Sequence, residues 1–150
     1  MLRQSGAKFL PHFYTYADQG GTRVASLALA VDEHAVIKTL VFQTDMKQPF
    51  LVLMHGDLEA SSKQLARTLG VRQVTACDVA SAQRITGYTV GGISPFGTRS
   101  RLPVLAEQTI FALPRIWING GKRGFLVEID PAIMKPLLDI VEVDVGIGKG

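Results

Sequence analysis

The chain has 150 residues, of which 47% are hydrophobic and only 19% are charged, so it can bury the core of one domain. Its single cysteine, Cys77, excludes an internal disulfide and fits a reducing compartment. The net charge of +3 is too small to indicate a polyanion partner by itself. No apolar run approaches the ~18 residues of a membrane span, and the amino terminus lacks the apolar core of a signal peptide. We therefore expect a cytoplasmic protein outside the membrane.

Strand patterns recur along the whole chain. Residues 36–42 are apolar and β-branched, and residues 50–54 form a continuous apolar run after Pro49. Such runs indicate strands that are buried on both faces. The other predicted strands are residues 12–16, 72–76, 102–105, 115–118, 124–129 and 141–145.

Helix signals are fewer, and they come mainly from capping residues. Ser61 and Gln64 form a capping box, and Gly70 and Gly87 are placed to end helices. Pro136 is expected to kink or shorten the last helix. The predicted N-caps are Thr22 before residues 24–31, Ser61 before 65–69, Asp78 before 79–86, and Asp130, followed by Pro131, before 132–138.

The predicted strands do not alternate regularly with the predicted helices, and several strands are placed to pair locally. This order favours an α+β fold, with a mixed, largely antiparallel sheet and packed helices. We expect residues 1–150 to form one domain, since no linker or repeat interrupts them.

Two glycine-rich segments are the most distinctive motifs. Residues 87–97 contain four glycines and one proline, which favours a stiff loop whose backbone a ligand can approach closely. Residues 119–124 form a second glycine loop. Either segment is also compatible with a plain hairpin turn. Cations gather beside both loops, and we expect them to contact phosphate groups of a nucleic acid: Arg99, Arg101, Lys122 and Arg123.

Lys38 lies within the apolar strand pattern of residues 36–42. A lysine in a buried strand is costly unless its ammonium meets a partner or a wet pocket. The alternative is an edge strand with Lys38 in solvent. If the lysine does face a pocket, a carbonyl, carboxylate or phosphate of a ligand is its natural partner.

The sequence offers little support for a metal or an enzyme nucleophile. His12, His34 and His55 are far apart without metal-ligand spacing, so we predict no metal site and no cofactor. A turn is the expected role of residues 55–57. Cys77 is interpreted as a small buried thiol, although a helix amino terminus nearby could lower a thiol pKa.

Four motifs, taken together in this order, resemble the YbaK/EbsC family, which is related to the inserted editing domain of bacterial prolyl-tRNA synthetase. They are Lys-Thr-Leu-Val at 38–41, Thr-Gly-Tyr at 86–88 continuing to Gly-Gly-Ile-Ser-Pro at 91–95, Arg-Leu-Pro at 101–103, and Gly-Gly-Lys-Arg-Gly at 120–124. The resemblance runs from about residue 13 to about residue 140 and is similar above all to the Cys-tRNA(Pro) deacylase branch.

The resemblance implies a trans-editing enzyme that hydrolyses the ester between a wrong amino acid and the 3′-terminal ribose of tRNA. It places Lys38 and Gly92 at catalytic positions. The implied substrate-binding residues are Tyr16, Thr39, Gly91, Ile93, Ser94, Pro95, Asn119 and Gly120. Asn119 stands where this branch commonly has serine, and Leu126 where it often has aspartate.

The expected mechanism needs no nucleophile from the enzyme. Backbone amides at Gly91, Gly92 or Gly120 would stabilise the oxyanion, a contribution of roughly 2.7–4 kcal/mol per donor, and Lys38 would act as a positioning cation. In the resembled branch, the thiol of the substrate's cysteine attacks its own carbonyl.

Three other functions stay open at this stage. The first is deacylation of alanine or serine esters by water, and the second is a non-catalytic module that binds RNA or aminoacyl-adenosine. A nucleotide or phosphate binder is a weaker third alternative, because the sequence matches neither standard phosphate-binding motif. The expected partners are mischarged tRNA and, from the resemblance, prolyl-tRNA synthetase. The sequence carries no signal for the oligomeric state.

Overall fold

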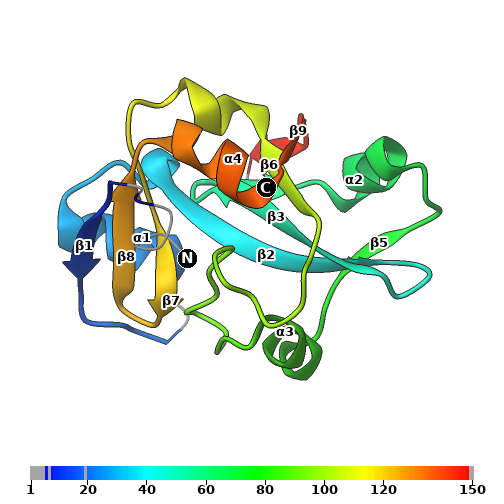
Figure 1. The fold of residues 1–150 in the computed structure, drawn as a ribbon, viewed down its shortest axis with the longest axis horizontal. Helices are drawn as coiled ribbons and strands as arrows, with labels where there is room; N and C mark the ends of the chain where they lie inside the picture. The colour runs from blue at the N-terminus through cyan, green and yellow to red at the C-terminus, as the bar shows by residue number, and fades with distance from the viewer. Residues whose placement is uncertain (1–5, 7, 19, 149–150) are drawn as a thin grey trace.

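A long antiparallel hairpin of two strands, β2 (Val36–Thr44) and β3 (Pro49–His55), runs through the centre of the fold (Figure 1). The structure is a computed structural model that describes residues 6, 8–18 and 20–148. Within these residues, eight strands form one sheet in the order β1-β8-β7-β2-β3-β6-β9, with β5 pairing to β2. The further strands of this sheet are β1 (Leu10–Phe13), β5 (Val74–Ala76), β6 (Val104–Glu107), β7 (Ile116–Lys122), β8 (Phe125–Ile129) and β9 (Val141–Val143).

The sheet is mixed, as predicted. The pairs β1–β8, β7–β8, β2–β3 and β2–β5 are antiparallel, and the pairs β2–β7, β3–β6 and β6–β9 are parallel. Two short strands, β4 (Leu58–Ala60) and β10 (Gly146–Gly148), pair separately. The α+β assignment is therefore confirmed.

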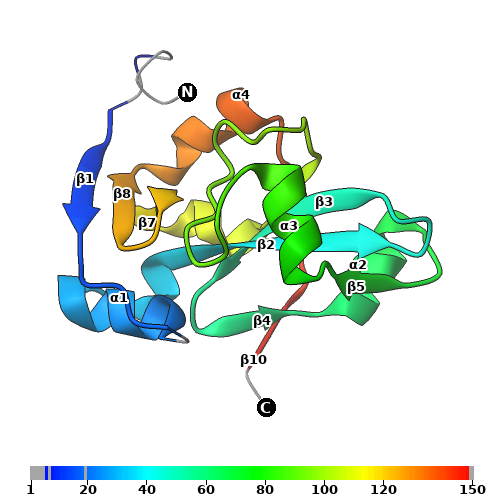
Figure 2. The same cartoon turned by 90° about the horizontal axis from the view of Figure 1, so that it is seen from below.

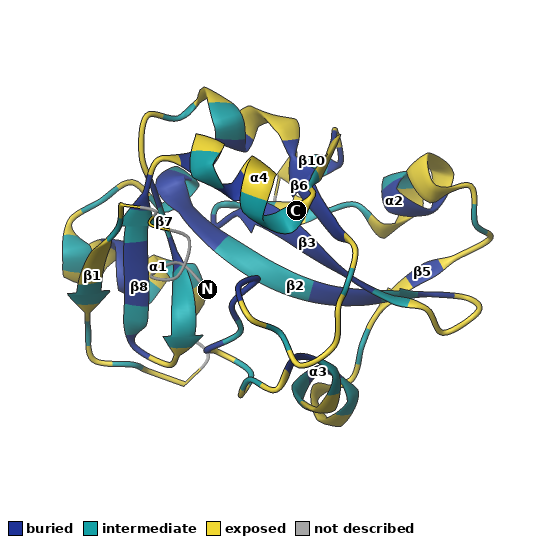
Figure 3. Ribbon diagram, in the orientation of Figure 1, coloured by how far each residue is buried: buried dark blue, intermediate teal, exposed yellow. Residues whose placement is uncertain are grey.

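Alternation along the central hairpin builds a core on each face of the sheet. Ile37 and Leu53 belong to one buried cluster, whereas Phe50 and Met54 belong to the other, because successive strand side chains point to opposite faces. Figure 3 shows both central strands as largely buried ribbons. The prediction that these apolar strands are buried on both faces is therefore confirmed.

Helices cover both faces of this hairpin. Figure 2 shows α3 in front of the β2–β3 hairpin, where Ala82 of α3 packs into the cluster of Ile37 and Leu53. Leu65 of α2 packs into the opposite cluster. The helices are α1 (Gly21–Leu29), α2 (Ser62–Leu69), α3 (Val79–Thr86) and α4 (Met134–Leu138), and short 3-10 turns span Glu33–Ala35, Gln108–Ala112 and Pro131–Ile133. None of the helices in the described ranges is long and apolar enough to cross a bilayer.

Most predicted helix ends are confirmed. The Ser61 hydroxyl accepts a hydrogen bond from the Gln64 amide at 3.2 Å, and Gly70 and Gly87 end their helices in the left-handed conformation. Asp130 caps the 3-10 turn that precedes α4, and α4 is only five residues long, as its proline requires.

Thr22 was wrongly predicted as an N-cap. The helix α1 already begins at Gly21, and the Thr22 hydroxyl donates to Glu33 Oε2 at 2.7 Å instead. Strand ends also differ from prediction: β1 stops at Phe13, and β7 continues through Gly121 to Lys122. The three-residue strands β4 and β10 were missed because such short segments carry no readable periodicity.

Candidate functional site

The candidate site occupies a break in the sheet. On one edge of β2, β7 pairs only with Val36 and Ile37, while β5 pairs only from Phe42 to Thr44. Figure 1 shows β7 and β5 beside opposite ends of β2. A cavity of about 630 Å³ opens at this stretch. Its lining residues are Tyr14, Tyr16, Asp18, Gly21, Thr22, Ala25, residues 36–40, Val90, Gly91, Ile93, Asn119 and Leu126.

Lys38 is half-buried on β2 and lines this cavity together with Tyr16 and Thr39. The cavity therefore decides between the two placements of Lys38 that the sequence left open, a pocket and bulk solvent. Besides its neighbour Thr39, four predicted residues from other segments, namely Tyr16, Gly91, Ile93 and Asn119, line the same cavity. These residues come together because strand pairing is interrupted along this edge of β2, which leaves room for the glycine loop.

The glycine loop contributes Gly91 and Ile93 to the cavity wall, but its other members play different parts. Gly91 has φ +93° and lies so close to Tyr16 that an added Cβ would approach the phenol oxygen to 2.5 Å. Ser94 is fully buried, and its hydroxyl accepts from the Phe96 amide at 3.1 Å. Neither Ser94 nor Pro95 is among the described residues that line this cavity.

Gly92 does not offer a free amide. Its N–H donates to the Thr89 carbonyl at 2.8 Å, so the oxyanion role predicted for this amide lacks a donor in the observed arrangement. An added Cβ would lie 2.7 Å from the Arg123 nitrogen and 2.8 Å from the Lys122 carbonyl carbon. Gly92 is therefore required by the close approach of two backbones.

Asn119 fixes the second glycine segment to the first. Its Oδ1 accepts from the amides of Gly121 (2.6 Å) and Lys122 (3.2 Å), while its Nδ2 donates to the carbonyls of Gly91 (3.3 Å) and Lys122 (2.9 Å). These bonds close a bulge in the β7–β8 pairing. Gly120 lies in this bulge, packed against the Phe125 ring and away from the cavity lining.

The predicted phosphate-binding cations separate into two places. Arg123 Nε donates to the Val90 carbonyl at 2.9 Å, and its guanidinium lies 4.8 Å from the centre of the Tyr16 ring. Lys122 beside it is exposed. Arg99 and Arg101 line a second cavity of about 830 Å³, which Pro95 and Gly97 of the glycine loop also line.

Several cavity residues were not predicted as ligand contacts. Tyr14, Ala25, Val36 and Leu126 form an apolar wall, and burial raises the pKa of the Tyr14 phenol, with a smaller contribution from Tyr16. The alternation of Tyr14 with Tyr16 was a usable signal, because residues two apart share a strand face. Cysteine, histidine and serine do not occur among the described residues lining the cavity.

Cys77 lies outside that lining, half-buried at the end of β5. Its amide donates to the Val41 carbonyl at 2.9 Å. Burial is the largest cause that raises the pKa of its thiol, which disfavours the thiolate. The interpretation of Cys77 as a packing residue is consistent with this environment.

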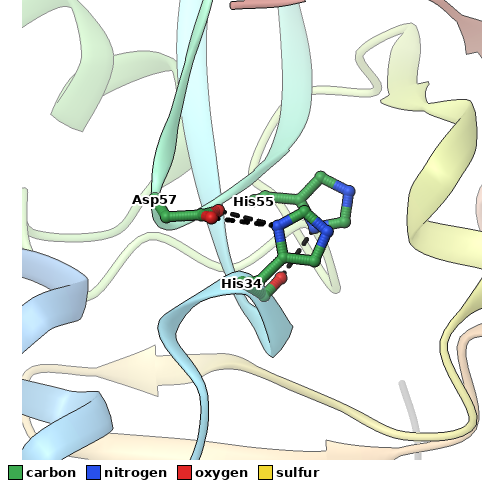
Figure 4. Close-up of side chains that lie close together, drawn as sticks. All are labelled: His34, His55 and Asp57. Carbon is green, nitrogen blue, oxygen red and sulfur yellow. Dashed lines mark hydrogen bonds and ion pairs between the residues drawn. The ribbon is translucent and has the colours of Figure 1, made fainter. Parts of the chain in front are cut away.

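Two of the three histidines, although distant in the sequence, come together in the fold. His34 and His55 stack with ring centres 3.7 Å apart, and His34 Nδ1 lies 2.9 Å from Asp57 Oδ1 (Figure 4). The potential ligand atoms of these three residues lie within 4.8 Å of one another. The ring planes, however, are only 5° from parallel, and imidazole lone pairs lie in the ring plane. The two rings therefore cannot direct lone pairs at one ion as they stand.

His55 is instead fully satisfied by protein groups. Its Nδ1 donates to the His34 carbonyl at 2.7 Å, and its Nε2 accepts from the Thr109 hydroxyl at 2.7 Å. Burial lowers the pKa of this imidazole below its ordinary value of 6.5, which agrees with a neutral ring. The cluster is thus a structural element at the open end of the β2–β3 hairpin, where β3 ends and β2 begins.

Comparisons with known proteins converge on one family. The model of the aminoacyl-tRNA editing domain matches residues 21–135. EbsC of Enterococcus faecalis, named as a Cys-tRNA(Pro)/Cys-tRNA(Cys) deacylase, is 28% identical over 104 residues, which cover 69% of this chain and 63% of that protein. A proline–tRNA ligase of Moorella thermoacetica is 29% identical over 136 residues, which cover 87% of this chain and 23% of the ligase.

The chain thus spans less than two thirds of the length of either relative. A solved structure described as a trans-editing enzyme for prolyl tRNA synthetase superimposes with a TM-score of 0.83 at 21% identity, covering 99% of this chain and 92% of that one. This likeness shows the fold.

Proposed function

The chain belongs to the aminoacyl-tRNA editing domain family, and on that premise we propose that it is a deacylase acting in trans on mischarged tRNA. Residues 1–150 would act as one editing domain in the cytoplasm. The observation that carries the proposal is the single cavity shared by Lys38, Tyr16 and Gly91. A strand cation, a phenol and a backbone loop around one space suit a small ester with a nearby phosphate.

In this proposal Lys38 holds the terminal nucleotide through its phosphate or ribose, so that the ester lies between β2 and the glycine loop. Such placement can contribute up to ~7–11 kcal/mol to lowering a barrier. The Gly91 amide is the proposed oxyanion donor in place of Gly92, since the Gly91 N–H has no hydrogen-bond partner among the described residues. Thr39, Ile93 and Asn119 would border the aminoacyl group.

Cysteine is the proposed amino acid, and its own thiol is the proposed nucleophile. The sulfur bonds to the carbonyl carbon, the ester C–O bond breaks, and the thiol proton passes to the ribose oxygen. A cyclic thioester and free tRNA result. The absence of cysteine, histidine and serine from the described cavity lining supports a nucleophile supplied by the substrate. The name of EbsC supports the choice of cysteine and of tRNA(Pro).

Alanine is the second candidate, because the wall of Ala25, Val36 and Leu126 is apolar and offers no charged contact to a side chain. Water would then attack the ester. Small pockets separate ligands that differ by one methylene by only about 1–3 kcal/mol, so both esters require measurement. A serine ester would place its side-chain hydroxyl against the same apolar wall, so it is a less favoured substrate than the alanine ester.

The tRNA body would approach over Arg99, Arg101, Lys122 and Arg123. Arg123 donates to Val90 of the glycine loop, and Arg99 and Arg101 line the second cavity together with Pro95 and Gly97 of that loop. Prolyl-tRNA synthetase is the proposed partner that delivers the tRNA. The test is a deacylation panel with Cys-, Ala- and Ser-tRNA(Pro), each with and without the synthetase. We expect the cysteine ester to be lost fastest. Tight tRNA binding without ester loss from any of the three would replace the deacylase by a binding module.

A further inference from the structure

Within the described residues, the break in the sheet leaves the backbone of Thr39 on β2 without a partner strand on one edge. Backbone groups of successive strand residues point to alternate edges. The Val36 carbonyl accepts from Gly56 on the β3 side, whereas the Val41 carbonyl accepts from Cys77 on the β5 side. Counting back by two from Val41, the N–H and C=O of Thr39 face the same edge as β5 and β7.

Neither neighbouring strand reaches Thr39. The pairing with β7 ends at Ile37, and the pairing with β5 begins at Phe42. No loop hydrogen bond to the Thr39 backbone is recorded within the described ranges. Thr39 lines the cavity, so its unpaired amide and carbonyl face the space that a ligand would fill.

The Thr39 side chain adds a second unsatisfied group at this place. Its hydroxyl oxygen is buried and has no hydrogen-bond partner within the described part of the structure. A buried polar group without a partner destabilises the folded protein, because it loses its hydrogen bonds to water and gains none in exchange. A ligand that forms hydrogen bonds with Thr39 would recover part of that loss.

We propose that the aminoacyl group pairs with Thr39 as an additional residue of the sheet. An α-amino ester carries its nitrogen and its carbonyl oxygen on adjacent carbons, as a strand residue does. Its α-ammonium would donate to the Thr39 carbonyl, and its ester carbonyl would accept from the Thr39 N–H, the double exchange of an antiparallel pair. This inference rests on the deacylase function proposed above and names the group that holds its substrate.

Main-chain pairing has a consequence for specificity. Thr39 would recognise the part that all aminoacyl esters share, and the cavity walls would select the side chain. Gly91 lines the same cavity, and its amide would be a second donor to the ester carbonyl. Two amides, one from the strand and one from the loop, would then face the developing oxyanion.

The sheet geometry supplies a sharp test, because proline removes an N–H. At position 39 this N–H takes no part in the β2–β3 ladder, so Thr39→Pro should fold, as prolines do where the missing donor faces away from a partner strand. Thr39→Val, which keeps the amide and removes only the hydroxyl, is the comparison variant, and Thr75→Val, at an exposed residue of β5 outside the cavity lining, is the control for activity. We expect Thr39→Pro to lower kcat/KM for the wild-type enzyme's best ester about tenfold to a hundredfold relative to Thr39→Val, and Thr75→Val to stay within about twofold of the wild type.

A folded Thr39→Pro protein with wild-type kcat/KM would overturn the pairing while leaving the deacylase function intact. If wild-type protein hydrolyses no ester, the proposed function fails, and the pairing is then judged by binding alone.

The binding measurement uses wild-type protein and therefore does not depend on a proline variant. A non-hydrolysable 3′-amide-linked aminoacyl adenosine is titrated into ¹⁵N-labelled protein. We expect the Thr39 amide proton to shift downfield and to exchange more slowly, and the desamino analogue to bind about tenfold more weakly. An unchanged Thr39 amide under saturating ligand would refute the pairing, as would equal affinities of the two analogues.

Discussion

Asn119 and Gly91 are joined by a hydrogen bond of 3.3 Å from the side-chain Nδ2 to the backbone carbonyl. The same side chain accepts from the amides of Gly121 and Lys122. One residue of β7 therefore closes its own bulge and ties it to the loop that borders the cavity. Asn119 lines the cavity, yet its polar atoms are occupied within the protein, which indicates that it positions the loop.

Substitution of Asn119 should separate these two tasks. Asn119→Asp keeps the acceptor for the two amides but loses the donor to Gly91, whereas Asn119→Ala loses both. We expect Asn119→Ala to lower the free energy of unfolding by about 1–3 kcal/mol and Asn119→Asp to lower it less, while both reduce kcat/KM. Urea unfolding and the deacylation assay measure the two effects. Equal stability of all three proteins would argue against the role in closing the bulge.

We expect Arg123 to support catalysis through its contacts with Val90 and Tyr16, and to support tRNA binding through its positive charge. Arg123→Ala removes the bond to the Val90 carbonyl and the contact with the Tyr16 ring, so we expect a fall in kcat as well as in tRNA affinity. Lys122→Ala is the matched control, because it removes an exposed positive charge next along the chain. A phosphate contact alone would make the two variants equal in kcat and in the salt dependence of tRNA binding.

The sequence predicted the central strands well, because residues 50–54 are all apolar, residues 36–42 are apolar except for Lys38 and Thr39, and both faces of the sheet are covered. It also predicted the meeting of Lys38, Tyr16 and Gly91 in one cavity, through the resemblance and not through periodicity. The break between β7 and β5 was not predictable, since it depends on where two distant strands stop pairing with β2.

Pairing between strands that are distant in the sequence also explains what the sequence analysis missed elsewhere. Residues 119–124 were interpreted as a loop, but Asn119 replaces missing ladder bonds with its side chain and lets β7 continue through the bulge. His34 and His55 are distant in sequence, yet the hairpin register sets His55 opposite Ile37, next to the turn that carries His34. Local composition contains neither relationship.

We expect the stability of the protein to require glycine at position 92, because there is no space for a side chain. In Gly92→Ala the new methyl group would lie within 3 Å of the Lys122 and Arg123 backbones, so we expect a loss of about 1–3 kcal/mol in unfolding free energy. Gly148→Ala is the control, because nothing lies within 4 Å of its added Cβ. Thermal and urea unfolding report the difference. A Gly92→Ala protein of wild-type stability would contradict the close backbone contact.

Lys38 should be indispensable for deacylation but dispensable for folding. We expect Lys38→Ala to lose about 100-fold or more in kcat/KM, since positioning contributes so large a share of catalysis, and to keep a cooperative unfolding transition. Lys47→Ala, which removes an exposed lysine at the tip of the same hairpin, should leave the rate unchanged. Full activity of a folded Lys38→Ala protein would overturn the assignment of this cavity as the catalytic site.

His55 should make the protein less stable in mild acid. Burial lowers its pKa below 6.5, so below that pH the unfolded chain binds more protons at this position than the folded protein does. The free energy of unfolding therefore rises with pH through this window. The contribution is complete above pH 6.5 and is lost as the pH falls toward the pKa of the folded state.

His55→Asn tests this contribution directly, because its amide can donate to the His34 carbonyl in place of Nδ1 and does not titrate. We expect the variant to be less stable near neutral pH, where the hydrogen bond to Thr109 is lost, but to show a shallower dependence of unfolding free energy on pH between about pH 8 and pH 5. Urea unfolding at several pH values gives both slopes. Identical slopes for the two proteins would show that another group controls the response to acid.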